Sequence, residues 1–430
     1  MSRFLKDSST LIGGNVIAQG ITVLSYFLLS RLYTTAEFGA FNRFYSYVEI
    51  LIILSTLRYE LATPIAASPR EAAAVARLSL ILNTVFSVLL FPLILLLPKA
   101  WLPPFALLLP LMVFFCGTTR VYTALFNRFR EFRQNATSVV VTSVTGVLAK
   151  ILYALRSSIH NLQIFKSSNL QITNALGLPL GTVLGQAAGN VNYLMRLRRL
   201  RLPRRTTKEE YREVAKRFSD FAKFTTPKDL INSLSHNLPI IWLPLAFAVP
   251  DASIGLFGMA LTFTFRPVNI LNNAFEQVLY VRTAEKVRQK ETIWGDIRKF
   301  ILVLNACALP LFVVAFFIAE PAATFFFGDR WEGCGYYIRC LLPWVYVMLT
   351  STSLMFFANV FGRQHTEFRF YLVLFILRIA ALVVGIVQQD FQLAILLFST
   401  VSASVSIALL VWYMRMIREY ESEIRERYRE

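Results

Sequence analysis

Long apolar segments recur along almost the whole chain and alternate with short polar ones. About twelve of them have the length of a membrane span: 9–31, 42–66, 73–97, 104–127, 136–155, 171–195, 221–248, 254–278, 298–320, 336–360, 367–388 and 391–414. Apolar runs near twenty residues are typical of transmembrane helices, because a helix of that length crosses the hydrocarbon core of a bilayer. The pattern therefore predicts an all-α integral membrane protein with about twelve transmembrane helices.

The sixth apolar segment differs from the others in being rich in Gly and Asn. It reads NLQITNALGLPLGTVLGQAAGNVNYL. Small residues allow membrane helices to approach each other closely, so we expect this segment to be packed inside a helical bundle. The connection before it, 156–170, is unusually polar and supports no assignment.

The composition supports a membrane protein. Hydrophobic residues make up 56% of the chain and charged residues 16%, with a mean hydropathy of +0.53, whereas soluble domains carry about 25% charged residues. The cysteines lack metal-ligand spacing and no two histidines are close in sequence, so we expect no metal site and no cofactor. Cys334 and Cys340 are near enough in sequence for a disulfide, but unpaired apolar cysteines are the simpler interpretation.

Basic residues are concentrated in every second loop. The densest stretch, 196–217, reads RLRRLRLPRRTTKEEYREVAKR and lies in the middle of the chain. Because Lys and Arg remain on the inner side of a bilayer, it is predicted to be a cytoplasmic loop, and both termini are predicted to be cytoplasmic. The net charge of +18 is then explained by such loops and anionic lipid headgroups, and a nucleic-acid partner is not expected.

The two halves of the sequence resemble each other at an offset of about 216 residues. Gly39-Ala40-Phe41 aligns with Gly255-Leu256-Phe257, and Glu60 falls opposite Glu276. Both halves start on the cytoplasmic side, so the repeat is parallel, an arrangement in which transporters hold substrate between the halves.

The repeat predicts four parts: a six-helix lobe at 1–197, a basic cytoplasmic linker at 198–219, a second six-helix lobe at 220–416 and a charged cytoplasmic tail at 417–430. The tail alternates charge at helical spacing, which predicts a solvated surface helix.

Ionisable residues also fall inside the predicted spans, where a charge at the helix centre costs about 2.5–3.5 kcal/mol. These are candidates for substrate binding: Arg58, Glu60, Arg120, Lys150, Lys228, Asp229, Arg266 and Arg378. Glu60, Asp229 and Glu276 are candidates for ion coupling, and Glu49 is a less central member of the set.

Two interpretations of these charges remain open. One is internal salt bridges, with Arg58 paired to Glu60 and Lys228 to Asp229. The other is a cavity that binds an anion, because cations outnumber acids and guanidinium groups suit phosphate oxygens.

Four stretches carry a resemblance to a known family. They are LSTLRYELATPIA, TPKDLINSLSHNLPIIWL, FRPVNILNNAFEQVLY and FFFGDRWEGCGYYIRCLLPW. The chain resembles the polysaccharide-export flippases, the Wzx-like or O-antigen group of the multidrug/oligosaccharidyl-lipid/polysaccharide (MOP) exporter superfamily. Cys334 stands where that family usually has Ala, and the similarity is weakest over 155–185.

The resemblance implies a MATE-like, V-shaped fold of two lobes around a central cavity, and a transporter rather than an enzyme. Its substrate would be an undecaprenyl-diphosphate-linked oligosaccharide, moved by alternating access from the cytoplasmic to the periplasmic leaflet of the bacterial inner membrane. This step serves surface polysaccharide (O-antigen, capsule or exopolysaccharide) synthesis. Membrane lipids, a polysaccharide polymerase and chain-length machinery are the other partners that it implies.

Other functions remain alternatives. A drug or cation exporter of the same superfamily would favour an acidic cavity, and a flippase for the peptidoglycan precursor would have more spans. A membrane glycosyltransferase or polymerase would carry catalytic groups on a large outer loop, whereas the predicted outer loops are short.

Overall fold

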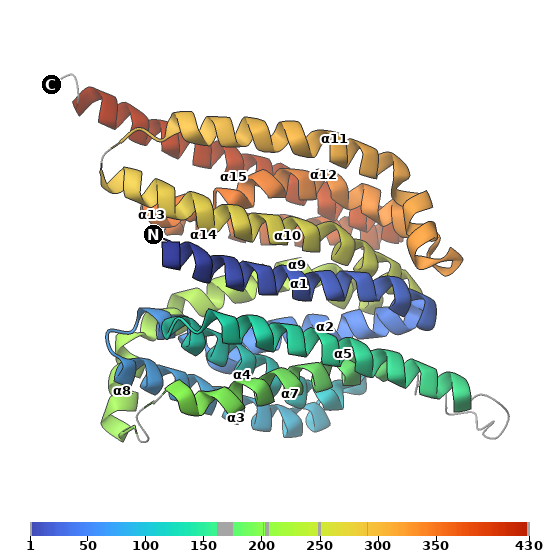
Figure 1. The fold of residues 1–430 in the computed structure, drawn as a ribbon. Coiled ribbons are helices and arrows are strands. Elements are labelled where there is room, and N and C mark those ends of the chain that lie inside the picture. Colours follow the sequence, from blue (N-terminus) through green and yellow to red (C-terminus); the bar gives the residue numbers. More distant parts are fainter. Residues whose placement is uncertain are drawn as a thin grey trace. The chain divides into compact units, whose positions relative to one another are not determined.

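The computed structural model describes residues 2–160, 175–200, 202, 206–247, 251–289 and 291–427. Within these ranges all regular elements are helical, and twelve of the helices contain twenty or more residues. Eight described helices are long and apolar enough to cross a membrane, and Figure 1 shows the helices in chain order. The predicted all-α membrane fold is confirmed.

The described chain forms two compact units. Unit 1 comprises Met1–Ile241 and Pro250–Gly255. Its helices are α1 (Ser2–Leu32), α2 (Thr35–Thr56), the 3₁₀ helix η1 (Tyr59–Ile65), α3 (Pro69–Leu96), α4 (Leu109–Arg128), α5 (Phe132–His160), α7 (Gly177–Leu197), α8 (Lys208–Arg217), most of α9 (Thr226–Phe247) and the first turn of α10 (Asp251–Arg288).

Unit 2 comprises Trp242–Val249 and Leu256–Glu430. It contains the rest of α10, followed by α11 (Trp294–Phe327), α12 (Cys334–Ser353), α13 (Phe356–Val360), α14 (Gln364–Val387) and α15 (Phe391–Arg427). The cysteines are free, and the Cys334 thiol donates to the Leu256 carbonyl oxygen at 3.5 Å rather than pairing with Cys340.

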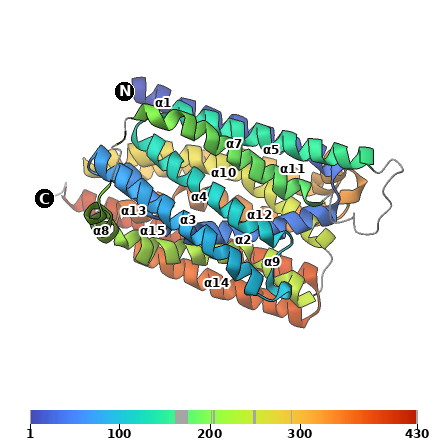
Figure 2. The same cartoon turned by 90° about the horizontal axis from the view of Figure 1, so that it is seen from below.

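Helix α7 is packed along α5 through a row of glycines, and Figure 2 shows the two helices side by side. A Cβ atom at Gly181 would lie 3.0 Å from the Gly146 carbonyl oxygen, and one at Gly185 would lie 2.5 Å from the Thr142 carbonyl oxygen. These positions therefore require glycine for close approach of the two backbones. The predicted packed helix is confirmed.

Helices α2 and α10 meet at the two glycines that the sequence repeat aligns. A Cβ atom at Gly39 would lie 1.7 Å from the Asp251 carbonyl oxygen, and one at Gly255 would lie 1.9 Å from the Thr35 carbonyl oxygen. Beside this crossing, Arg43 Nη1 donates to Asp251 Oδ1 at 2.9 Å. The contact is reciprocal, since each glycine faces the residue four positions before the other.

The basic linker contains a short docked helix, α8. Its first turn has a capping box: Glu210 N–H donates to the Thr207 hydroxyl, and Thr207 N–H donates to the Glu210 carboxylate at 2.8 Å. The latter bond lowers the pKa of Glu210 from its ordinary value of 4.5. Val214 is buried against η1 and α3, and the Tyr59 hydroxyl donates to the Ala215 carbonyl oxygen at 3.0 Å. The linker thus contacts η1 directly.

The C-terminal segment extends the last membrane helix instead of forming a separate solvated helix. Ile417 and Ile424 are buried on one face of α15. Between them, Glu421 Oε2 accepts the backbone N–H groups of Ile293 and Trp294 at 3.1 Å. This face of α15 is not solvated, so the prediction of a solvated helix is wrong for it. The Glu421 carboxylate accepts hydrogen bonds from backbone N–H groups that have no acceptor within α11.

Candidate functional site

The candidate site is built where α2 ends. Leu57 and Arg58 adopt φ angles of 48° and 60°, the left-handed region that non-glycine residues rarely enter. This conformation costs roughly 1–2 kcal/mol per residue, and it turns the chain from α2 into η1. Backbone strain of this kind is concentrated at functional sites.

Arg58 is shared by two carboxylates. Its Nη1 lies 3.4 Å from Glu60 Oε1, and its Nε lies 2.7 Å from Asp229 Oδ2. The side chains of Arg58, Glu60 and Asp229 are 16%, 3% and 24% exposed, respectively. The predicted salt bridge between Arg58 and Glu60 is therefore present, whereas Asp229 pairs with Arg58 instead of with Lys228.

A π-helical turn, Phe221–Thr225, leads into α9 and Asp229. Pro227 has no N–H, and in a regular α-helix its ring would collide with the carbonyl of residue 223. The wider π turn relieves that conflict, and the Thr226 hydroxyl donates to the Phe221 carbonyl oxygen at 3.1 Å. Single π turns of this kind are frequent at functional sites.

Arg120, on α4, is the second cation of the site. Its charge interacts with the charges of Arg58 and Glu60. Its Nη1 atom is buried and has no hydrogen-bond partner among the described residues. A buried guanidinium with an unsatisfied N–H group is able to bind an added anion.

A further polar contact lies on the same two helices, α2 and α9. Asn237 Nδ2 donates to Glu49 Oε2 at 3.0 Å. Asn237 is buried, and Glu49 also interacts electrostatically with Cys116. Asn237 was not predicted from the sequence, because a neutral amide in an apolar helix gives no signal without its partner.

The other predicted site residues have different surroundings. Lys150 lies on α5, with its Nζ atom 5.3 Å from the centre of the Phe41 ring. Lys228 is half-buried beside Asp229, and Arg266 is half-buried on α10 in unit 2. The side chain of Glu276 lies outside the described residues.

Arg378 in unit 2 has an aromatic environment. Its guanidinium carbon lies 4.7 Å from the centre of the Trp344 ring and 4.6 Å from that of the Phe398 ring. Its Nε donates to the Ser402 hydroxyl at 2.8 Å, and the residue is 2% exposed. The two rings and the hydroxyl hold the cation in the core of unit 2.

Glu367 is a buried acid that the sequence pattern did not single out. It is 2% exposed and accepts a hydrogen bond of 2.6 Å from the Tyr413 hydroxyl. The signal was missed because residue 367 falls at the first position of a predicted span, where charges are common.

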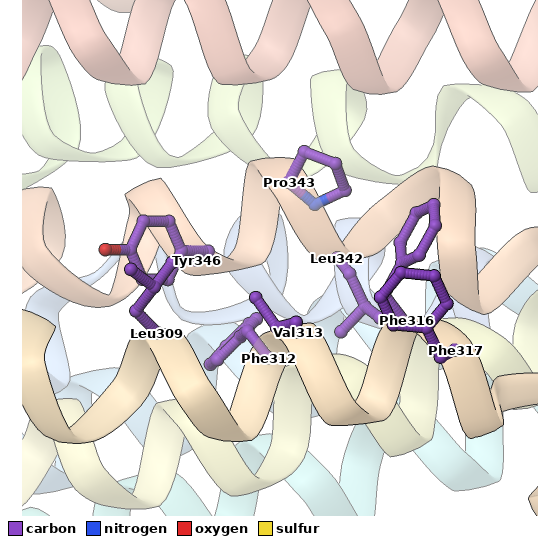
Figure 3. A pocket seen from close by; sticks show the side chains of 8 residues that line it. All are labelled: Leu309, Phe312, Val313, Phe316, Phe317, Leu342, Pro343 and Tyr346. Atoms are coloured by element: carbon purple, nitrogen blue, oxygen red, sulfur yellow. The ribbon is translucent and has the colours of Figure 1, made fainter.

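An apolar pocket of about 210 Å³ lies between α11 and α12 (Figure 3). Its lining consists of Leu309, Phe312, Val313, Phe316, Phe317, Leu342, Pro343 and Tyr346. Tyr346 supplies the polar group of this lining, so the pocket suits hydrocarbon and has no group to recognise a charge.

Comparison with known proteins links the chain to polysaccharide synthesis and to a transporter fold. Residues 183–335 match the model of a family described as polysaccharide biosynthesis protein. No protein of curated function matches the sequence.

Solved transporter structures share the fold. The chain is similar to an inward-facing multidrug resistance MATE family transporter of the MOP superfamily, with a TM-score of 0.61 and 13% identity over 94% of this chain and 96% of that one. A MATE protein in complex with MaD5 gives a TM-score of 0.62 and 12% identity over 97% of both chains. A MOP superfamily transporter from Pyrococcus furiosus gives 0.59 and 11%, over 96% of this chain and 95% of that one. The fold is therefore that of the MATE and MOP transporters.

Proposed function

We propose that the protein is a flippase that moves an undecaprenyl-diphosphate-linked oligosaccharide from the cytoplasmic to the periplasmic leaflet of the bacterial inner membrane. The transporter fold and the match to a polysaccharide-biosynthesis family support a transport role in that process. The lipid-linked substrate is suggested by the charge of the site.

One observation carries the proposal: the buried Nη1 of Arg120 has no hydrogen-bond partner among the described residues and lies in a cluster with Arg58. An unsatisfied buried donor costs about 1–3 kcal/mol, so the site gains when an anion accepts from it. A diphosphate has several acceptor oxygens, and guanidinium groups bind such oxygens with two parallel hydrogen bonds.

The transport step follows from this chemistry. The diphosphate and its sugars occupy the site from the inner side, while the polyprenyl chain remains in lipid. A conformational change then opens the site outward, as in other transporters built from repeats. An inside-negative potential favours outward movement of negative charge by about 2.3 kcal/mol per charge per 100 mV.

A rival of the same fold, an exporter of drugs or organic cations, would need an acidic site. The Pyrococcus furiosus transporter is described as having a binding pocket of reverse polarity that suggests a different function. Pocket polarity is therefore a useful discriminator within this fold, and the unsatisfied donor here belongs to a cation.

The test is translocation of a fluorescent undecaprenyl-diphosphate-linked disaccharide by the purified protein in liposomes. Arg120→Ala should slow translocation at least about tenfold, since a charge-assisted hydrogen bond of about 1.5–3 kcal/mol is lost. Arg120→Lys should retain part of the rate, because lysine keeps the charge but not the paired donors.

Arg212→Ala is the matched control, because Arg212 is an exposed arginine on α8. It should translocate at the wild-type rate. A wild-type rate for Arg120→Ala at equal protein level, or transport of an organic cation dye in place of the lipid, would contradict the proposal.

A further inference from the structure

Arg58 has partners from both halves of the sequence repeat. Glu60 lies two residues away on η1, whereas Asp229 lies on α9, at the start of the second half. The pair with Asp229 therefore ties the end of α2 to the start of α9. In the proposed function, on which this inference rests, the Arg58 guanidinium is also a ligand for the substrate diphosphate.

We propose that Asp229 is a latch that the substrate displaces: a phosphate oxygen takes the place of the Asp229 carboxylate on Arg58, and α9 is released from the end of α2. Substrate binding and the movement of α9 are then one event.

The present partners of Arg58 do not satisfy all of its hydrogen-bond donors. Its Nε atom lies 2.7 Å from Asp229 Oδ2 but makes no hydrogen bond to any described residue. The contact to Glu60 is long, at 3.4 Å, and Glu60 Oε2 is also buried without a hydrogen-bond partner in the described part of the chain. The two carboxylates thus neutralise Arg58 while its Nε donor stays unsatisfied, whereas an added phosphate is free to align with that donor.

Repulsion between like charges favours the departure of a carboxylate when a diphosphate binds. The cluster has two arginines, Arg58 and Arg120, and two acids, Glu60 and Asp229. A diphosphate placed beside both carboxylates would meet like charges, which a partly buried site disfavours.

Asp229 is the acid that is able to leave. Glu60 is 3% exposed and is held close to Arg58 by the short η1 segment, whereas Asp229 is 24% exposed and belongs to a different helix. A released Asp229 carboxylate regains water at that partly exposed position. Movement of α9 is absorbed next to it, at the π turn of 221–225 and at Pro227.

The experiment measures binding of inorganic diphosphate, the soluble group shared with the substrate, to the purified full-length protein. Removal of the competing charge in Asp229→Asn should tighten binding about fivefold, the change that corresponds to a partly exposed ion pair of about 1 kcal/mol. Asp251→Asn is the matched control, because it breaks the Arg43 pair at the other end of α2. It should leave diphosphate affinity unchanged.

Hydrogen–deuterium exchange supplies a second readout. Saturating diphosphate should raise exchange in 221–232 of the wild type, and Asp229→Asn should show that raised exchange without ligand. Equal or weaker diphosphate binding by Asp229→Asn would overturn the latch, since Asp229 would then merely hold Arg58 in place.

The two proposals fail differently. If the wild type binds diphosphate and Arg120→Ala does not, the site stands whatever Asp229→Asn does. If the wild type does not bind diphosphate, the proposed function fails and the latch fails with it.

Discussion

Arg58 and Arg378 show how two arginines in predicted spans acquire different roles from their surroundings. Arg58 is held by two imperfectly placed carboxylates next to the unsatisfied Arg120. Arg378 is enclosed by Trp344 and Phe398. In the proposed latch the cation of Arg58 exchanges ligands, whereas the cation of Arg378 is part of the packing of unit 2.

At the residue scale, Arg378→Ala should lower stability. Each desolvated cation–π contact contributes on the order of 0.5–2 kcal/mol, and the substitution also leaves a cavity, so we expect a loss of about 2–4 kcal/mol. The measurement is the midpoint of thermal unfolding of the purified protein in detergent. Arg369→Ala, at an exposed arginine of the same helix, should leave the midpoint unchanged. An unaltered midpoint with abolished transport in Arg378→Ala would instead make Arg378 a substrate ligand.

At the scale of elements, the bundle depends on glycines at helix crossings. The α5–α7 contact uses a row of them, and the α2–α10 contact uses the repeat-related pair Gly39 and Gly255. In a membrane no hydrophobic force drives helices together, so close packing of small residues carries the association. The linker helix α8 is different, because it is stabilised by its capping box and by contacts with η1 and α3.

Gly185→Ala should destabilise the α5–α7 pair. The new Cβ atom would lie 2.5 Å from the Thr142 carbonyl oxygen and 2.9 Å from Gly146 Cα, and overpacking of this kind costs about 1–3 kcal/mol. The thermal midpoint should fall accordingly. Gly20→Ala is the control, because nothing lies within 4 Å of its added Cβ and alanine favours a helix by up to about 1 kcal/mol. A midpoint for Gly185→Ala as high as that of Gly20→Ala would contradict the close-packing explanation.

At the scale of the whole molecule, the alternation of basic loops predicts the orientation. Cytoplasmic loops retain Lys and Arg, and the densest basic stretch, 196–217, lies between the predicted lobes. The division into lobes at 1–197 and 220–416 stays a prediction. In the structure, the first part of α9 and the first turn of α10 are grouped with unit 1.

Reporter fusions test the orientation. Green fluorescent protein fused after residue 430 should fluoresce, because the C-terminus is expected in the cytoplasm. Alkaline phosphatase inserted at 102–104 should be active, since this loop is expected in the periplasm, whereas the same insertion at 129–131 should be inactive. Activity at 129–131 would reverse the predicted topology.

The all-α membrane fold followed from the sequence, although eight described helices, rather than the predicted twelve segments, are long and apolar enough to cross a membrane. Helix formation in a bilayer depends on apolar length, a local property that can be read directly from the chain. The glycine-rich segment at 171–195 was likewise predicted as a packed helix, because small residues allow another membrane helix to approach closely. The C-terminal tail was mispredicted, since only its contact with the start of α11 shows that Glu421 is a cap.

By itself, the sequence determined that this chain is a helical membrane protein and that its predicted spans contain more basic than acidic residues. Only the tertiary structure decided which charges meet: Arg58 with Asp229, Arg120 near them, and Arg378 between aromatic rings. The physical reason is the separation of the interacting residues along the sequence. The length of an apolar segment is a property of one helix. An ion pair requires residues far apart in sequence to come within a few ångströms of each other, which depends on how the helices pack.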